Sequence, residues 1–94
     1  MAGDVDFASL RNLGPKSNAV LRAVGIHSVE QLRALGAVAV YSRIRQAGPS
    51  IGFKPSLNLL WALEGAISDR PWQTVAKEDR LSLLMQLETL EQTP

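Results

Sequence analysis

An apolar residue followed by Arg, two further residues and Gly recurs through the first half of the chain. The glycines of this motif are spaced by eleven, eleven and twelve residues: Gly14, Gly25, Gly36 and Gly48. Glycine adopts the positive φ that ends a helix, and Arg in a last turn complements the negative end of the helix dipole. A continuous helix with an eleven-residue period is disfavoured by its interior glycines and by Pro15. Each motif therefore predicts a helix end.

Start signals for separate helices fall between these ends. Pro15 suits a first helical turn, and Ser28 with Gln31 three residues later forms a capping box. We expect four short helices, near residues 6–12, 15–24, 29–35 and 37–47.

The second half of the chain has longer apolar stretches. The turn-forming residues 48–52 predict a break after the fourth helix. Apolar residues at helical spacing then predict a helix over 55–68, which ends before Pro71, and a last helix near 76–91. No segment alternates with the period of a strand. We expect one all-α domain over residues 1–94, a bundle of five to six short helices whose N-terminal part resembles a helix-hairpin-helix.

Charge is distributed unevenly along the chain, although the net charge is only +1. Residues 11–54 carry seven basic residues and one acidic residue, whereas residues 64–94 carry three basic and six acidic ones. This asymmetry favours an anionic partner or self-association through opposite patches. A solvated surface with uneven charge would give the same pattern.

The composition also bounds the class of protein. An apolar content of 46% with 20% charged residues is typical of a folded globular chain. The N-terminus carries Asp4 and Asp6 where a signal peptide would be basic, and no apolar run is long enough to cross a bilayer. We expect a soluble cytoplasmic protein that does not bind membranes.

The segment around Gly14 is similar to a helix-hairpin-helix motif. In that motif a glycine-rich turn presents backbone N–H groups to a phosphate beside the N-terminus of the second helix. Here Asn12 replaces the first glycine, Arg11 replaces a proline, and Lys16 supplies a cation. A contact with the DNA backbone would use Asn12, Leu13, Gly14, Lys16, Ser17, Arg22 and Arg43. The alternative is a hairpin that only packs two helices.

Four blocks of sequence together resemble the C-terminal domain of the TfoX/Sxy family over about residues 8–75. They are LRNLGPKS at 10–17, LRAVGIHSVEQL at 21–32, LGAV at 35–38 and PSLNLLWALEGA at 55–66, with Trp72 downstream. The family comprises bacterial regulators of competence for DNA uptake. The resemblance implies a transcription-related adaptor without enzymatic activity. Such regulators typically carry a mixed α/β domain ahead of this one, so we expect a stand-alone copy.

Candidate chemistry is sparse. His27 is the only histidine and cysteine is absent, so neither a metal site nor a nucleophile–base pair is indicated. Glu64 lies among apolar residues, where a salt-bridged structural role is expected. Trp61, Trp72 and Tyr41 are expected to be core anchors. We expect no enzyme, no cofactor and no catalytic residue.

The last helix has apolar residues on more than one side. A partner protein or a second copy of the chain would contact Leu83, Leu87 and Leu90. Alternatively, the helix packs in a groove of its own domain.

Three hypotheses follow from the sequence. The first is a regulatory interaction module of TfoX/Sxy type, with a protein of the transcription machinery as its partner. The second is a non-specific binder of the DNA backbone, and the third is a self-associating structural domain.

Overall fold

The computed structural model describes residues 13–92, which form six helices and no strand. This confirms the all-α prediction. The first predicted helix, near 6–12, lies outside the described residues. The helices are α1 (Pro15–Ala23), α2 (Val29–Leu35), α3 (Ala37–Ile51), α4 (Leu57–Ser68), α5 (Trp72–Glu78) and α6 (Arg80–Gln92).

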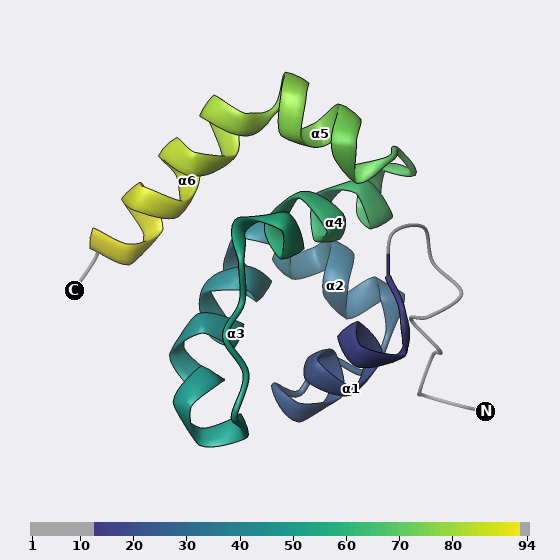
Figure 1. Cartoon of the computed structure of the whole chain (residues 1–94), viewed down its shortest axis with the longest axis vertical. Coiled ribbons are helices and arrows are strands. Elements are labelled where there is room, and N and C mark those ends of the chain that lie inside the picture. Colours follow the sequence, from purple (N-terminus) through teal and green to yellow (C-terminus); the bar gives the residue numbers. More distant parts are fainter. Residues whose placement is uncertain (1–12, 93–94) are drawn as a thin grey trace.

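Helices α3 and α4 join the other helices of the domain (Figure 1). Helix α4 packs against α3 and α5, and α3 also packs against α1, α2 and α6. In Figure 1, α5 and α6 form an arch over one side, and α1 lies on the opposite side. None of the described helices is both long enough and apolar enough to cross a membrane.

The start of α2 confirms the predicted Ser28 cap, whereas the Gln31 side chain bonds the N–H of His27, one residue before the cap, instead of that of Ser28. The backbone N–H of Gln31 donates to Ser28 Oγ at 3.1 Å, and the Gln31 side chain accepts from the backbone N–H of His27 at 2.7 Å. The bond to Ser28 satisfies a donor that a helix start leaves unpaired, and the bond from His27 ties the preceding residue to the first turn.

The glycine motif predicts helix ends correctly at Gly25 and Gly36, and the helix expected before Gly14 lies outside the described residues. Gly25 and Gly36 follow α1 and α2 with φ values of 87° and 86°. Gly14 instead has an extended conformation, with φ −124°, and is the N-cap of α1. Gly48 lies inside α3. The predicted helix end at Gly48 is therefore wrong.

Helix α3 continues beyond the predicted break and ends at Gly52, which has a left-handed conformation with φ 66°. Gly48 is needed for a different reason. A Cβ atom at this position would lie 2.5 Å from the backbone oxygen of Phe53. The Phe53 N–H donates to the Gly48 carbonyl at 3.0 Å. The glycine permits the returning chain to approach the helix closely.

The expected helix near 76–91 is two helices. It begins earlier, at Trp72, and is interrupted at Asp79, whose φ and ψ of −109° and 1° are not helical. The interruption directs the two halves onto different neighbours, because α5 packs on α4 whereas α6 packs mainly on α3. Helix periodicity alone does not reveal such a bend.

The core joins all six helices. Tyr41 and Trp61 are buried, as expected, while Trp72 is half-buried against the core. The largest fully buried side chains are aliphatic: Leu21, Ile26, Leu32, Ile44, Leu60, Leu63, Val40 and Val75. Burial of these apolar side chains is the main driving force for this fold.

The contact at Gly48 predicts whether Gly48→Ala raises or lowers the free energy of unfolding. In an ordinary helix interior, Gly→Ala stabilises by about 1 kcal/mol. Here the added Cβ meets a backbone oxygen, so we expect Gly48→Ala to lower the free energy of unfolding by about 1–3 kcal/mol. Gly14→Ala, at the N-cap of α1, is a control for a substitution without a collision, because nothing lies within 4 Å of its Cβ position. Urea unfolding measures both, and a stabilised Gly48→Ala variant would contradict the close contact.

Candidate functional site

The residues of the predicted hairpin contact do not all lie together. Lys16 and Ser17 lie in the first turn of α1, Gly14 caps that helix, and Leu13 is buried in the core. Asn12 lies outside the described residues.

The two arginines of the predicted contact lie near the other end of α1. Arg22 is in its last turn. Arg43 extends from α3, and its Nη1 donates to the carbonyl oxygen of Val24, the C-cap of α1, at 3.4 Å. A rise of about 1.5 Å per residue separates the backbones of Lys16 and Arg22 by about 9 Å. The basic groups therefore divide between the two ends of α1.

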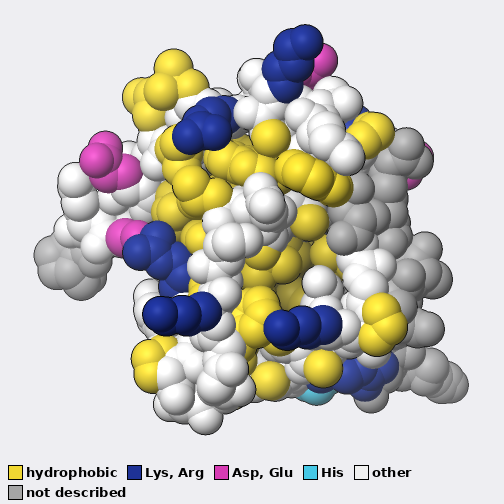
Figure 2. All heavy atoms as spheres, in the orientation of Figure 1, with side chains coloured by type: hydrophobic (Ala, Val, Ile, Leu, Met, Phe, Trp, Pro, Cys, Tyr) yellow, Lys and Arg dark blue, Asp and Glu magenta, His cyan; other side chains and the backbone are white. Residues whose placement is uncertain are grey.

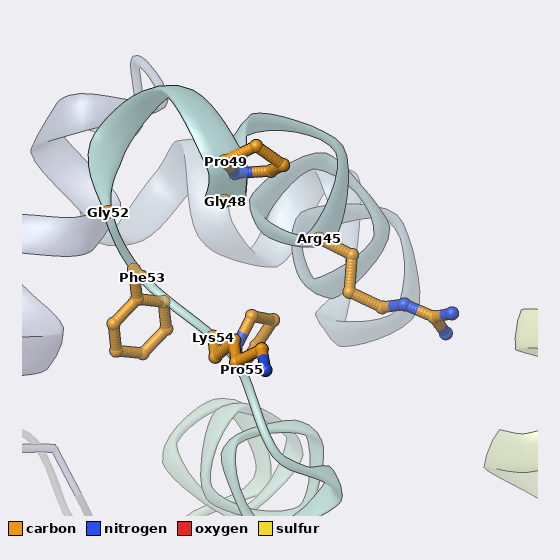
Figure 3. A pocket seen from close by; sticks show the side chains of 7 residues that line it. All are labelled: Arg45, Gly48, Pro49, Gly52, Phe53, Lys54 and Pro55. Carbon is orange, nitrogen blue, oxygen red and sulfur yellow. The ribbon is translucent and has the colours of Figure 1, made fainter.

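A cavity of about 640 Å³ lies between the last turns of α3 and the segment that leads to α4 (Figure 3). We call it the loop groove. Phe53, Pro49 and Pro55 give it a largely apolar lining. The complete lining is Arg45, Gly48, Pro49, Gly52, Phe53, Lys54 and Pro55.

Three cations lie at or near the loop groove. Arg45 and Lys54 belong to its lining, and Lys16 Nζ lies 5.4 Å from the centroid of the Phe53 ring. In Figure 2, Lys and Arg side chains lie among hydrophobic ones over the lower part of the face, where α1 and the end of α3 are seen. The groove thus combines apolar surface with positive charge.

Arg45 connects this region to the end of α6. Its Nη1 lies 3.2 Å from Glu91 Oε1, and its guanidinium lies 5.9 Å from the centroid of the Tyr41 ring. Burial raises the pKa of the Tyr41 hydroxyl, although the positive charge of Arg45 lowers it in part. The ion pair shows that a carboxylate fits beside Arg45.

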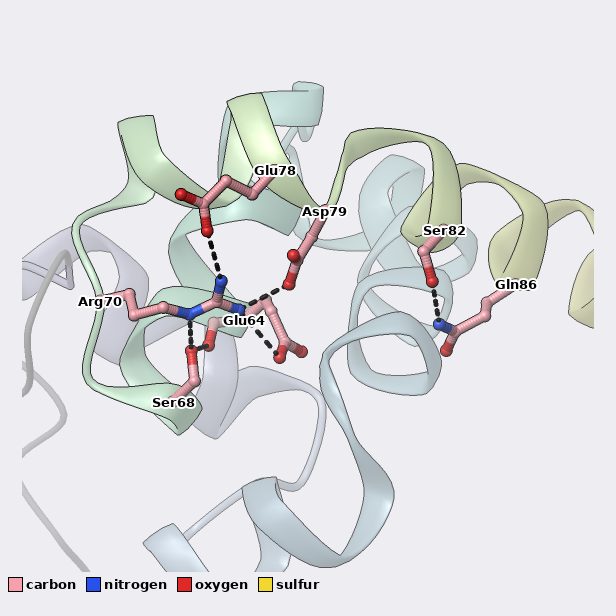
Figure 4. A network of polar contacts seen from close by, with 7 residues as sticks. All are labelled: Glu64, Ser68, Arg70, Glu78, Asp79, Ser82 and Gln86. Atoms are coloured by element: carbon pink, nitrogen blue, oxygen red, sulfur yellow. Dashed lines mark hydrogen bonds and ion pairs between the residues drawn. The ribbon is translucent and has the colours of Figure 1, made fainter.

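A second polar cluster centres on Arg70, between α4 and α5 (Figure 4). Its guanidinium lies 2.5 Å from Asp79, and 3.7 Å from both Glu64 and Glu78. Its Nε donates to Ser68 Oγ at 2.9 Å. The cluster links α4, α5 and the start of α6. Glu64 is thus part of a salt bridge between helices, which is the structural role expected from the sequence.

The carboxyls around Arg70 respond to it differently. Burial raises the pKa of Glu64, and the positive charge of Arg70 offsets this rise only in part. The hydrogen bond from Arg70 lowers the pKa of Asp79. Asp79 therefore stabilises the fold when ionised, whereas ionised Glu64 carries a desolvation cost.

The apolar face of α6 differs from the predicted one. Leu83 and Leu87 are buried in the core of their own domain, so neither offers a surface to a partner. The side of α6 that carries Leu83 and Leu87 faces the core, where α6 packs on α3. Leu90 is 42% exposed, and the other exposed apolar residues of α6 are Leu81 and Met85.

No group of three or more His, Cys, Asp or Glu side chains that could hold a metal ion occurs among residues 13–92. His27 is exposed at the start of α2.

The loop groove is the feature that sequence analysis missed. The sequence predicts only a break at residues 48–52, from their glycines and proline, and assigns no role to residues 53 and 54. The available signal was a single Phe followed by Lys between these turn residues.

Comparisons with known proteins identify a matching family and a solved structure with the same fold. The model of the TfoX C-terminal domain family matches residues 5–87. The crystal structure of an uncharacterized protein from Listeria monocytogenes has the same fold, with a TM-score of 0.74 at 24% identity. The alignment covers 93% of this chain and 94% of that one. No curated protein matches the chain.

The Arg70 cluster predicts a pH-dependent difference between two isosteric variants. Because the fold lowers the pKa of Asp79, its stabilisation is complete above the pKa of the unfolded chain, near 4, and is lost as the pH falls toward the folded-state pKa. We expect Asp79→Asn to lower the Tm by a few degrees at neutral pH, with the difference shrinking in acid.

Glu64→Gln is the matched control. It removes another carboxylate that pairs with the Arg70 guanidinium, but the pKa of Glu64 is raised by the fold, not lowered. We expect it to leave the Tm at neutral pH unchanged or higher. Thermal unfolding across a pH series checks both variants. Equal losses in the two would contradict the distinction drawn between these carboxyls.

Proposed function

The chain belongs to the TfoX C-terminal domain family, and from this membership we propose that it is a regulatory interaction module that controls the transcription of genes for DNA uptake. The family is one of non-enzymatic domains. The match over residues 5–87 is the observation that carries the proposal. The partner is a protein of the transcription machinery.

The arrangement of side chains supports a binding role over a catalytic one. The carboxylates around Arg70 pair with its guanidinium and tie α4 to α5 and to the α5–α6 junction. The loop groove joins an apolar lining to exposed cations, which is the composition of a recognition surface. Neither region pairs a nucleophile with a base.

Binding to the DNA backbone is the second candidate function. It is favoured by Lys16 and Ser17 in the first turn of α1, where backbone N–H groups and a cation could meet a phosphate. Against it, Arg43 bonds to the C-terminal end of the same helix, and Pro15 has no N–H to donate.

Deletion of the gene in its source organism tests the regulatory role. We expect the transcripts of DNA-uptake genes and the frequency of transformation to fall together, and complementation with the wild-type gene to restore both. The empty vector is the control. Unchanged transcripts in the deletion strain, under conditions in which the gene is expressed, would overturn the proposal.

A salt series with a labelled duplex separates the second function from the first. A protein-binding role predicts that Lys16→Glu and Lys77→Glu reduce any weak, salt-sensitive duplex binding equally. Lys77 is the matched control, because it is an exposed cation on α5, outside the predicted contact. Tight binding that falls steeply with salt and that only Lys16→Glu abolishes would establish the DNA contact instead.

A further inference from the structure

We propose that the loop groove binds an acidic segment of a partner protein that inserts an apolar side chain between Pro49, Phe53 and Pro55. This inference rests on the proposed function, because it assumes that the partner is a protein. It adds the place of binding and the chemistry of the bound segment.

The shape of the loop groove suits a side chain. Its volume of about 640 Å³ falls in the range of ligand pockets, which receive compact apolar groups. The two prolines fix the backbone on both sides, and the Phe53 N–H is bonded to the Gly48 carbonyl at 3.0 Å. A groove held in this way loses little conformational entropy on binding.

The charges around the loop groove select acidic segments. Lys54 and Arg45 belong to its lining, Lys16 lies over the Phe53 ring, and no acidic residue is among the lining residues. Lysine and arginine at the rim of an apolar patch attract carboxylates and increase the rate of encounter. Glu91 already places one carboxylate 3.2 Å from Arg45. Carboxylates of a partner would continue this pairing toward Lys54.

A peptide fits these observations better than a nucleic acid does. A duplex needs an array of cations along a convex or flat surface, whereas this surface is hollow and mostly apolar. Single strands bind by stacking on several aromatic side chains, and the lining contains only Phe53.

Fluorescence anisotropy with a short labelled peptide of Asp, Glu, Leu and Phe tests the proposal. We expect saturable binding by the full chain that Lys54→Glu weakens roughly five- to tenfold. The matched control Lys77→Glu, on α5, should leave the affinity unchanged. Amide NMR spectra should show shifts at Gly48, Gly52 and Phe53 when the peptide is added.

Three comparison probes make the result specific. A peptide with Ser in place of Leu and Phe, and one with Lys in place of Asp and Glu, should both fail to bind. Equal binding of the Ser peptide would reduce the site to non-specific charge attraction and overturn the proposal. Tighter binding of oligothymidylate than of the acidic peptide, or amide shifts confined to other helices, would also overturn it.

The outcome is separable from that of the gene deletion. If the transcripts respond to the deletion but the peptide does not bind, the loop groove is not the site and the regulatory function stands. If the peptide binds at the groove but the transcripts do not respond, the site stands and the regulatory function is wrong.

Discussion

The close contact between Gly48 and the backbone of Phe53 determines how the chain reverses after α3. The Phe53 N–H bonds to the Gly48 carbonyl, and a side chain at position 48 would collide with the Phe53 oxygen. Because the chain turns this tightly, α4 can return along α3 and bury Leu60 and Leu63 in the shared core. Helix α4 in turn supports α5, so that most of the packing in the second half of the domain depends on this reversal.

The same reversal creates the surface to which we assign binding. The loop groove lies where residues 52–55 run close to the last turns of α3, and Pro49 and Pro55 belong to its lining. The charged groups of the domain have separate tasks. Arg70 ties α4 to α5 and to the α5–α6 junction through three carboxylates, whereas Lys54 and Lys16 remain exposed near the groove. The stabilising network and the candidate recognition surface therefore share no residue, and selection could change one without weakening the other.

Sequence patterns predicted the parts of the fold that local chemistry decides. Ser28 caps α2 through Gln31, Gly25 and Gly36 follow helices, and the apolar spacing after Pro55 marks α4. The patterns failed where a distant segment decides. A glycine that ends a helix and a glycine that admits a neighbouring backbone look alike in sequence, so Gly48 was assigned the wrong role. The interruption at Asp79 and the burial of Leu83 follow from how α5 and α6 pack on different helices. The loop groove was missed for the same reason, because its lining comes from both sides of a chain reversal.

Hydrogen exchange at the Phe53 amide tests most directly whether the loop groove is a preformed site. Amides in stable structure exchange through openings that approach global unfolding, whereas loop amides exchange through small local openings. The structure predicts that the Phe53 amide, bonded to Gly48, exchanges nearly as slowly as the Leu63 amide in the interior of α4. Exchange of Phe53 at the rate of an unprotected loop residue would show that the contact with Gly48 is not maintained, and would contradict the account of both the fold and the groove.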